Sequence, residues 1–94
     1  MERANLSLFE FICRSRHKRI LGSYFVKSRK ARTVREIAEK VGLSKETVRR
    51  FIKETIRCRF VDELKPTKQN TFARYIVNKQ HYFYNIILEL SRND

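Results

Sequence analysis

The chain has 94 residues, enough for one compact domain with one modest core, and we expect a single domain over residues 1–94. Apolar residues make up 41% of the chain, so it can fold, unlike a basic disordered tail. No apolar run is long enough to span a bilayer, so neither a signal peptide nor membrane association is expected. The two cysteines, Cys13 and Cys58, are expected to be free thiols in a reducing cytoplasm.

The positive charge is concentrated in one half of the chain. The formal net charge is +12, and residues 14–59 alone hold sixteen Lys and Arg against four Asp and Glu. The remaining residues hold six of each sign and sum to zero. Such a one-sided excess is more than solubility requires, and its natural partner is a polyanion. We therefore expect double-stranded DNA as the partner and a cytoplasmic, nucleoid-associated location.

Two apolar segments precede the most basic part of the chain. Residues 6–13 are predicted to form a short apolar helix or lead-in, and residues 17–26 repeat apolar side chains at helical spacing. Residues 27–32 then form a basic connector. The apolar side chains of the two segments are Leu8, Phe9, Phe11, Ile12, Ile20, Leu21, Tyr24 and Phe25.

A helix-turn-helix is predicted between Thr33 and about Ile56. Thr33 and Glu36 have the spacing of a capping box that opens the first helix, and Gly42 is the type of residue that ends one. Ser44 is expected to cap the second helix. Two helices joined by so tight a turn are typical of a DNA-binding motif whose second helix enters the major groove. The expected inward positions are Ile37, Ala38, Val41, Leu43, Val48, Phe51, Ile52 and Thr55 or Ile56.

The predicted outward face of the second helix is almost entirely basic, whereas an idle surface helix would alternate acids and bases. Glu46 either accepts a hydrogen bond from a cytosine amino group or pairs with Arg49 or Arg50. The basic connector either follows the DNA backbone or is a solvated loop. The predicted contacts to bases are Lys45, Glu46, Arg49 and Arg50. The predicted contacts to phosphates are Thr33, Arg35, Thr47, Lys53, Arg29, Lys30 and Arg32.

After Arg57 the sequence allows two interpretations. Residues 60–64 and 71–77 are candidate strands, which would make the domain a winged helix with a β-hairpin at about 60–77. Neither run alternates cleanly, and apolar side chains also recur at helical spacing, so we favour a helix. The expected fold class is mainly α, a tri-helical helix-turn-helix domain with a C-terminal helix. The expected helical stripe consists of Phe72, Ile76, Phe83, Ile87 and Leu90.

Residues 60–94 are near neutral in charge and rich in large apolar groups. A single helix-turn-helix contacts few base pairs, whereas a dimer places two DNA-reading helices on one face of the DNA. We therefore expect a homodimer, paired through residues 60–94 and the apolar residues near the N-terminus. The alternative is that the C-terminal helix folds back on the helix-turn-helix.

Residues 22–48 resemble the stage III sporulation protein D family. The segments that carry the resemblance are GSYFV, a basic connector, TVREIA, VG and SKETV. This resemblance implies a compact sequence-specific regulator that activates or represses genes, with Lys45, Arg49 and Arg50 on the helix that reads DNA. The same helix-turn-helix is similar to winged-helix repressors of the arsenic-repressor type. This chain has Thr55 and Arg59 where those repressors usually have leucine and glycine.

No phosphate-binding loop, nucleophile elbow or pair of catalytic carboxylates is present, so no enzyme, cofactor or small-molecule substrate is expected. Cys13, His17, Cys58 and His81 have no recognised zinc spacing, and no metal site is expected. The alternative functions are a non-specific architectural or single-strand nucleic-acid-binding protein and a protein–protein adaptor.

Overall fold

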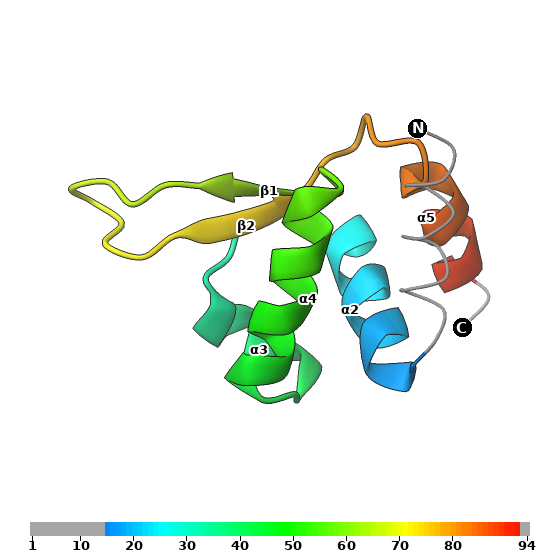
Figure 1. Ribbon diagram of the computed structural model, residues 1–94, viewed down its shortest axis with the longest axis horizontal. Helices are drawn as coiled ribbons and strands as arrows, with labels where there is room; N and C mark the ends of the chain where they lie inside the picture. Colours follow the sequence, from blue (N-terminus) through cyan, green and yellow to red (C-terminus); the bar gives the residue numbers. More distant parts are fainter. Residues whose placement is uncertain (1–14, 93–94) are drawn as a thin grey trace.

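The computed structural model describes residues 15–92, and within them the chain forms four helices and one two-stranded antiparallel sheet. Three helices pack around one core, a hairpin projects from the end of the third, and the last helix returns to lie against the first (Figure 1). The mainly helical fold class is confirmed. The elements in chain order are α2 (Arg16–Lys27), α3 (Val34–Val41), α4 (Lys45–Arg57), β1 (Val61–Leu64), β2 (Arg74–Val77) and α5 (Tyr84–Arg92). The apolar group expected at residues 8–12, and Cys13, lie outside the described residues.

The predicted capping signals of the helix-turn-helix are all present. The Thr33 hydroxyl accepts a hydrogen bond from the Glu36 amide at 3.2 Å, and the Glu36 carboxylate accepts one from the Thr33 amide at 3.1 Å. That bond from the Thr33 amide lowers the pKa of the Glu36 carboxyl. Gly42 ends α3 in the left-handed conformation at φ 71°, and the Ser44 hydroxyl caps α4. The local sequence therefore determines where both helices begin and where α3 ends.

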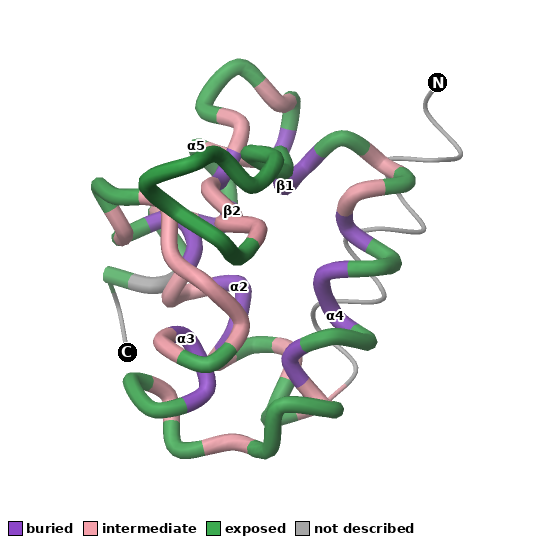
Figure 2. Tube along the Cα trace, turned by 90° about the vertical axis from the view of Figure 1, so that its left-hand side faces the viewer, coloured by how far each residue is buried: buried purple, intermediate pink, exposed green. Residues whose placement is uncertain are grey.

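The inner faces of α2 and α4 meet at a pair of aromatic rings. Phe25 and Phe51 stack with 5.9 Å between ring centroids and 10° between ring planes. Such pairs stabilise a core beyond the burial of their area. Buried and exposed stretches alternate along α4 in Figure 2, so one side of this helix faces the core and the other faces solvent. Of the predicted inward positions, Leu21, Phe25, Ile37, Ala38, Val48, Phe51, Ile52 and Thr55 are buried, and Tyr24, Val41, Leu43 and Ile56 are partly buried.

The carboxyl end of α4 closes in a turn that leads directly into the sheet. The Arg59 amide donates to the Ile56 carbonyl at 3.0 Å, and the Phe60 amide donates to the Thr55 carbonyl at 2.9 Å. These two bonds form a Schellman motif, which requires a left-handed residue after the helix. Arg59 fills that position with φ 61°, although glycine is the residue that adopts it without cost.

The helix favoured for residues 70–90 is wrong, and the hairpin alternative is confirmed. Strands β1 and β2 pair with Val61 opposite Val77, and only these two residues at the base are buried. The rest of the hairpin projects from the core, so the alternation of buried and exposed residues on which strand prediction relies never develops. Phe60, which spoiled the expected alternation, belongs to the turn that ends α4. We call β1, β2 and the loop 65–73 between them the wing.

The five residues of the predicted helical stripe do not share one helix. Phe72 lies in the wing loop with 72% of its surface exposed, and Ile76 lies in β2. Phe83 and Ile87 are buried in the core, whereas Leu90 is exposed. The C-terminal helix therefore folds back on the helix-turn-helix with its Ile87 side, which was the stated alternative to a dimer seam.

A single-residue bridge joins the wing to the connector before α3. The Arg32 amide donates to the Tyr75 carbonyl at 3.1 Å, and the Tyr75 amide donates to the Arg32 carbonyl at 2.8 Å. This bridge adds the connector to the sheet beside β2. It fixes the position of the wing relative to the start of α3.

His81 connects the turn before α5 to the end of α4. Its Nδ1 accepts a hydrogen bond from the Phe83 amide at 3.1 Å, so Nε2 must be the donor to the Cys58 carbonyl, also at 3.1 Å. The ring packs edge-on against Phe60, with 5.5 Å between centroids. Burial lowers the pKa of the His81 imidazole, the hydrogen bond to the Cys58 carbonyl partly opposes this shift, and the bond that Nδ1 accepts requires the neutral ring.

We expect the stability of the fold to decrease as His81 becomes protonated. Because the folded-state pKa of His81 lies below the unfolded value of about 6.5, its contribution is complete above that pH and is lost as pH falls through the folded pKa. Urea unfolding of the wild type between pH 8 and pH 5 should show this loss. His81→Ala should lower the unfolding free energy by about 1–3 kcal/mol at pH 7.5 and remove the pH-dependent step. His17→Ala serves as the control and should retain it.

A second stability test uses the left-handed residue after α4. Arg59→Gly should raise the free energy of unfolding by about 0.5–1 kcal/mol, because glycine adopts this φ without steric cost. Gly42→Ala is the matched opposite change, and it should lower stability by about 1 kcal/mol through the backbone alone, since a Cβ there meets no atom within 4 Å. Chemical denaturation measures both variants. A less stable Arg59→Gly variant would show that the arginine side chain outweighs the backbone strain.

Candidate nucleic-acid interface

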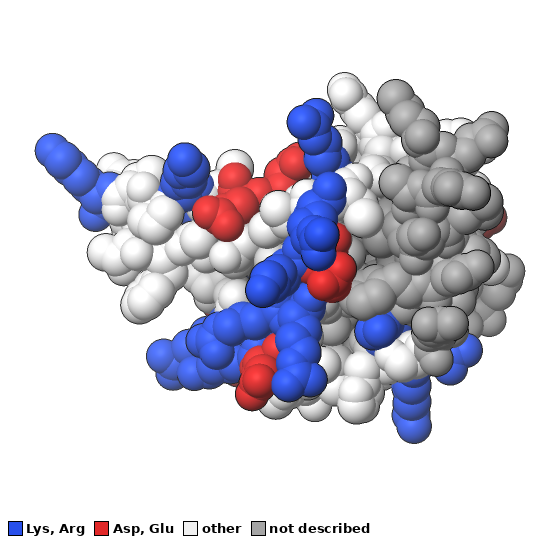
Figure 3. Space-filling view, viewed as in Figure 1, with Lys and Arg blue, Asp and Glu red and all other residues white. Residues whose placement is uncertain are grey.

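The outward face of α4 carries six of the predicted DNA-contacting residues. All of them except the partly buried Thr47 are exposed along the same side of the helix. In Figure 3, Lys and Arg form a continuous band that follows α4 and extends toward α3. The residues of α4 in this band and beside it are Lys45, Glu46, Thr47, Arg49, Arg50 and Lys53.

Ion pairs divide the cations of this face into two groups. Glu46 pairs with Arg50 at 3.0 Å, which is the alternative stated for Glu46 from the sequence. Within residues 15–92, Lys45, Arg49 and Lys53 have no carboxylate within 4.0 Å. An exposed pair such as Glu46–Arg50 contributes little to stability, so Arg50 can leave it for another anion at small cost.

A groove of about 370 Å³ lies on one side of α4, between this helix, the start of α3 and the wing. We call it the wing groove. Its cations, Arg35, Lys45 and Arg49, come from two helices, and its lining contains no acidic residue. The residues that line it are Thr33, Val34, Arg35, Lys45, Arg49, Phe72, Ala73 and Tyr75.

Tyr75 forms the floor between the wing and α4. Burial raises the pKa of its phenol, and the negative charge of Glu63, its partner on the neighbouring strand, raises it further, while the nearby charge of Arg49 opposes the shift.

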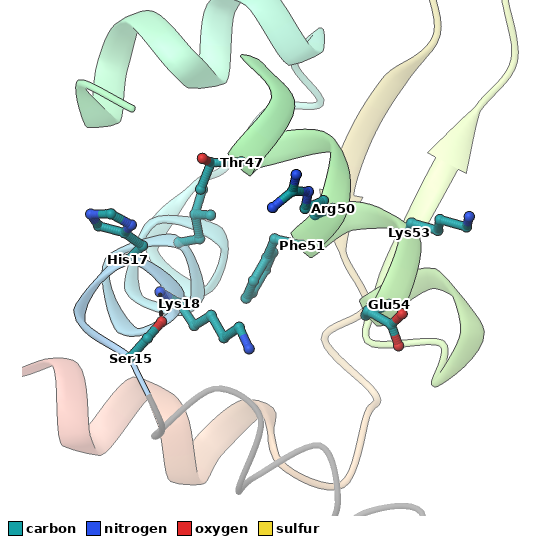
Figure 4. Close-up of a pocket in the computed structure, with 9 residues that line it drawn as sticks. Ser15, His17, Lys18, Thr47, Arg50, Phe51, Lys53 and Glu54 are labelled. Carbon is teal, nitrogen blue, oxygen red and sulfur yellow. Dashed lines mark hydrogen bonds between the residues drawn. The ribbon is translucent and has the colours of Figure 1, made fainter. Parts of the chain in front are cut away.

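A second groove of about 640 Å³ lies on the other side of α4, against the start of α2 (Figure 4). We call it the α2 groove. It is lined by His17 and Lys18 from α2 and by Thr47, Arg50, Lys53 and the acidic Glu54 from α4. Sequence reasoning missed the two α2 residues. The signal for them was the run RHKR in the first turn of α2, where acids are the residues that would stabilise a helix.

The three predicted phosphate contacts of the connector lie on neither groove. Arg29, Lys30 and Arg32 line a separate depression with Tyr24, Lys27, Ser28 and Lys40, and no residue of α4 borders it. Arg32 is also paired with Glu36 at 3.3 Å. The structure thus brings Thr33, Arg35, Thr47 and Lys53 to the α4 face but not the connector cations.

The described residues hold neither a metal cluster nor a membrane helix. Within residues 15–92, no group of three or more His, Cys, Asp and Glu side chains is placed to bind a metal ion. Cys58 is a free thiol whose pKa is raised by burial. No helix in the same range is long and apolar enough to cross a bilayer.

Comparisons with known proteins agree with the helix-turn-helix. The family model described as Sigma-70, region 4 matches residues 14–58, a span that holds α2, α3 and α4. A comparison with curated proteins gives no match.

Two solved structures share the fold of the whole chain, wing included. One is the crystal structure of the transcriptional regulator PA3341, with a TM-score of 0.65 and 17% identity over 99% of this chain and 73% of that one. The other is a mutant of S. aureus MepR, with a TM-score of 0.63 and 15% identity over 98% of this chain and 65% of that one. This chain therefore spans about two thirds to three quarters of their lengths. At such low identity the similarity establishes the fold, which is that of a winged helix-turn-helix.

Proposed function

We propose that the protein is a sequence-specific regulator of transcription that binds double-stranded DNA by inserting α4 into the major groove. The observation that carries this proposal is the position of α4. It presents a cationic face to solvent and is flanked by a cation-lined groove on each side. The match to a Sigma-70 region and the winged-helix fold support a DNA-binding role. The resemblance of residues 22–48 to a family of sporulation regulators points the same way. In this role the protein acts at the nucleoid.

The two grooves suit the two phosphate backbones that border a major groove. A helix in a groove about 12 Å wide approaches both backbones with its flanks and the base edges with its outermost side chains. On the wing side Thr33 and Arg35 contact one backbone, and on the α2 side Thr47 and Lys53 contact the other. Such contacts fix the register of the protein on DNA without reading its sequence.

Arg49 is the best candidate for a base contact. Its guanidinium is exposed, has no carboxylate partner in the described part of the chain and can donate to both O6 and N7 of guanine. Lys45, Glu46 and Arg50 complete the proposed base-reading set. Glu46 has two roles in this proposal, since it holds Arg50 in the free protein and becomes available to a cytosine amino group once Arg50 binds DNA.

Equilibrium titration of duplex DNA tests the proposal. Wild-type protein should bind a sequence selected from a random duplex pool more tightly than random duplex, and both affinities should fall with salt. Arg49→Ala should cost about 1–3 kcal/mol on the selected sequence and relax the preference at one base pair. Lys53→Ala should weaken binding to all sequences alike and lower the salt slope by about one.

The contrasting outcomes identify the alternatives. Equal, sequence-independent losses for Arg49→Ala and Lys53→Ala would indicate a non-specific architectural protein. Tighter binding to single strands than to duplex would indicate a single-strand binder. Absence of duplex binding at low salt would contradict a DNA-binding function altogether and favour a protein–protein adaptor.

We further propose that the regulator acts as a homodimer through the outer face of α5. Phe83 and Ile87, part of the seam expected from the sequence, are buried in the chain's own core and are unavailable for pairing. Ile86 and Leu90 on the same helix are exposed instead, at 41% and 47%. The charges of α5 cancel, since Glu89 pairs with Arg92 at 3.1 Å, so a second copy meets no repulsion there.

Sedimentation equilibrium at micromolar concentration tests the dimer. We expect twice the chain mass of 11.4 kDa for the wild type and a shift toward the monomer for Ile86→Glu with unchanged helix content. Leu64→Glu in the wing is the matched control, because Leu64 is also 40% exposed but lies away from α5, and it should leave the mass unchanged. A monomeric mass for the wild type both free and on DNA would rule the dimer out.

A further inference from the structure

We propose that the ring of Phe72 binds a deoxyribose face of the DNA strand that lies in the wing groove. The wing groove is then a mixed apolar and cationic site for a sugar–phosphate backbone. The inference rests on the proposed DNA-binding function and adds to it an apolar contact from the wing.

The exposure of Phe72 is the first observation. The ring keeps 72% of its surface in solvent, although sequence periodicity predicted it on the apolar stripe of a C-terminal helix. Tyr82 is exposed to the same extent, but its ring packs edge-on against Phe83 with 5.1 Å between centroids. In the described part of the chain Phe72 has no such ring partner. An apolar ring held in this way gains free energy only if something apolar covers it.

The surroundings of Phe72 indicate what covers it. The ring lines the wing groove together with Arg35, Lys45 and Arg49, and no acidic side chain lines this groove. The occupant must therefore be anionic and also present apolar surface. A second copy of this chain would bring its own cations to the groove and be repelled. A DNA strand satisfies both conditions, because its phosphates alternate with the carbon faces of its sugars.

The wing is built to hold the ring in place opposite α4. At its tip the Thr67 amide donates to the Asn70 carbonyl at 2.7 Å, and the Asn70 amide donates to the Thr67 hydroxyl at 3.1 Å. Along β2 the bridge between Arg32 and Tyr75 holds the strand beside the start of α3. Phe72 lies between these two hydrogen-bonded points of the backbone.

Titration of Phe72 variants against duplex DNA over a range of salt concentrations tests this contact. Phe72→Ala should lower affinity about five- to tenfold on the selected sequence and on random duplex alike. Its salt slope should equal that of the wild type, because no charge has been removed. Arg35→Gln in the same groove should instead lower the slope. Phe72→Leu should retain most of the affinity, and Tyr82→Ala, which removes an equally exposed ring elsewhere, should bind as the wild type does.

Full affinity of Phe72→Ala would overturn the contact while leaving the proposed function in place. A loss confined to particular sequences would also overturn it, since the ring would then touch a base and not a sugar. An equal loss of DNA affinity in Tyr82→Ala would show that exposed aromatic rings strengthen binding wherever they lie, and that the wing groove is not a specific site for the ring. If the wild type fails to bind duplex at all, both the proposed function and this contact are wrong.

Discussion

The carboxyl end of α4 is the constraint on which the rest of the structure depends. Four carbonyls at and just after this helix end receive hydrogen bonds from three residues, Phe60, Asn78 and His81. The Thr55 carbonyl receives the Phe60 amide, and the Cys58 carbonyl receives His81. The carbonyls of Arg59 and Phe60 receive the side-chain and backbone amides of Asn78. Orphan carbonyls at a helix end must find partners, and here those partners lie in the turn that leads into β1, directly after β2 and in the turn before α5. One helix terminus thus fixes the direction of the wing and the return of α5.

This arrangement explains why a chain of 94 residues can hold the start of α3, the face of α4 and the wing around one groove. The wing has little core of its own, because only Val61 and Val77 at its base are buried. It is positioned by backbone hydrogen bonds at its base, where Phe60 and Asn78 connect it to the end of α4, and along the edge of β2, where Tyr75 pairs with Arg32. The wing groove exists because these two attachments keep the wing at a distance from α4 while its base stays packed.

The helix-turn-helix was predictable from sequence because its signals are local. Thr33, Glu36, Gly42 and Ser44 act within one turn of their own positions, and the apolar period of α4 is repeated over three turns. The wing was not predictable in the same way. Its pairing joins residues separated by a nine-residue loop, and its exposed strands carry no alternating pattern. The same physical reason hid Phe72, since nothing near it in sequence marks an apolar residue as a surface contact. His17 and Lys18 were missed because their neighbours across the α2 groove belong to α4.

The electrostatics of the free protein are unfavourable where the proposed interface lies. Arg16 and Lys18 begin α2 without an acid in its first turn, whereas Lys45 at the start of α4 is followed by Glu46. Cations at the positive end of a helix dipole cost about 0.3–1 kcal/mol each when exposed, and a folded chain selected only for stability would place acids there. Helix N-termini are also where backbone amides bind phosphate oxygens, so the same cations become favourable once a DNA backbone lies against them. Under the proposed function, the stability that the free protein gives up at the start of α2 would be regained when a DNA backbone lies against it, which is the energetic arrangement expected of a surface that functions when bound to a polyanion.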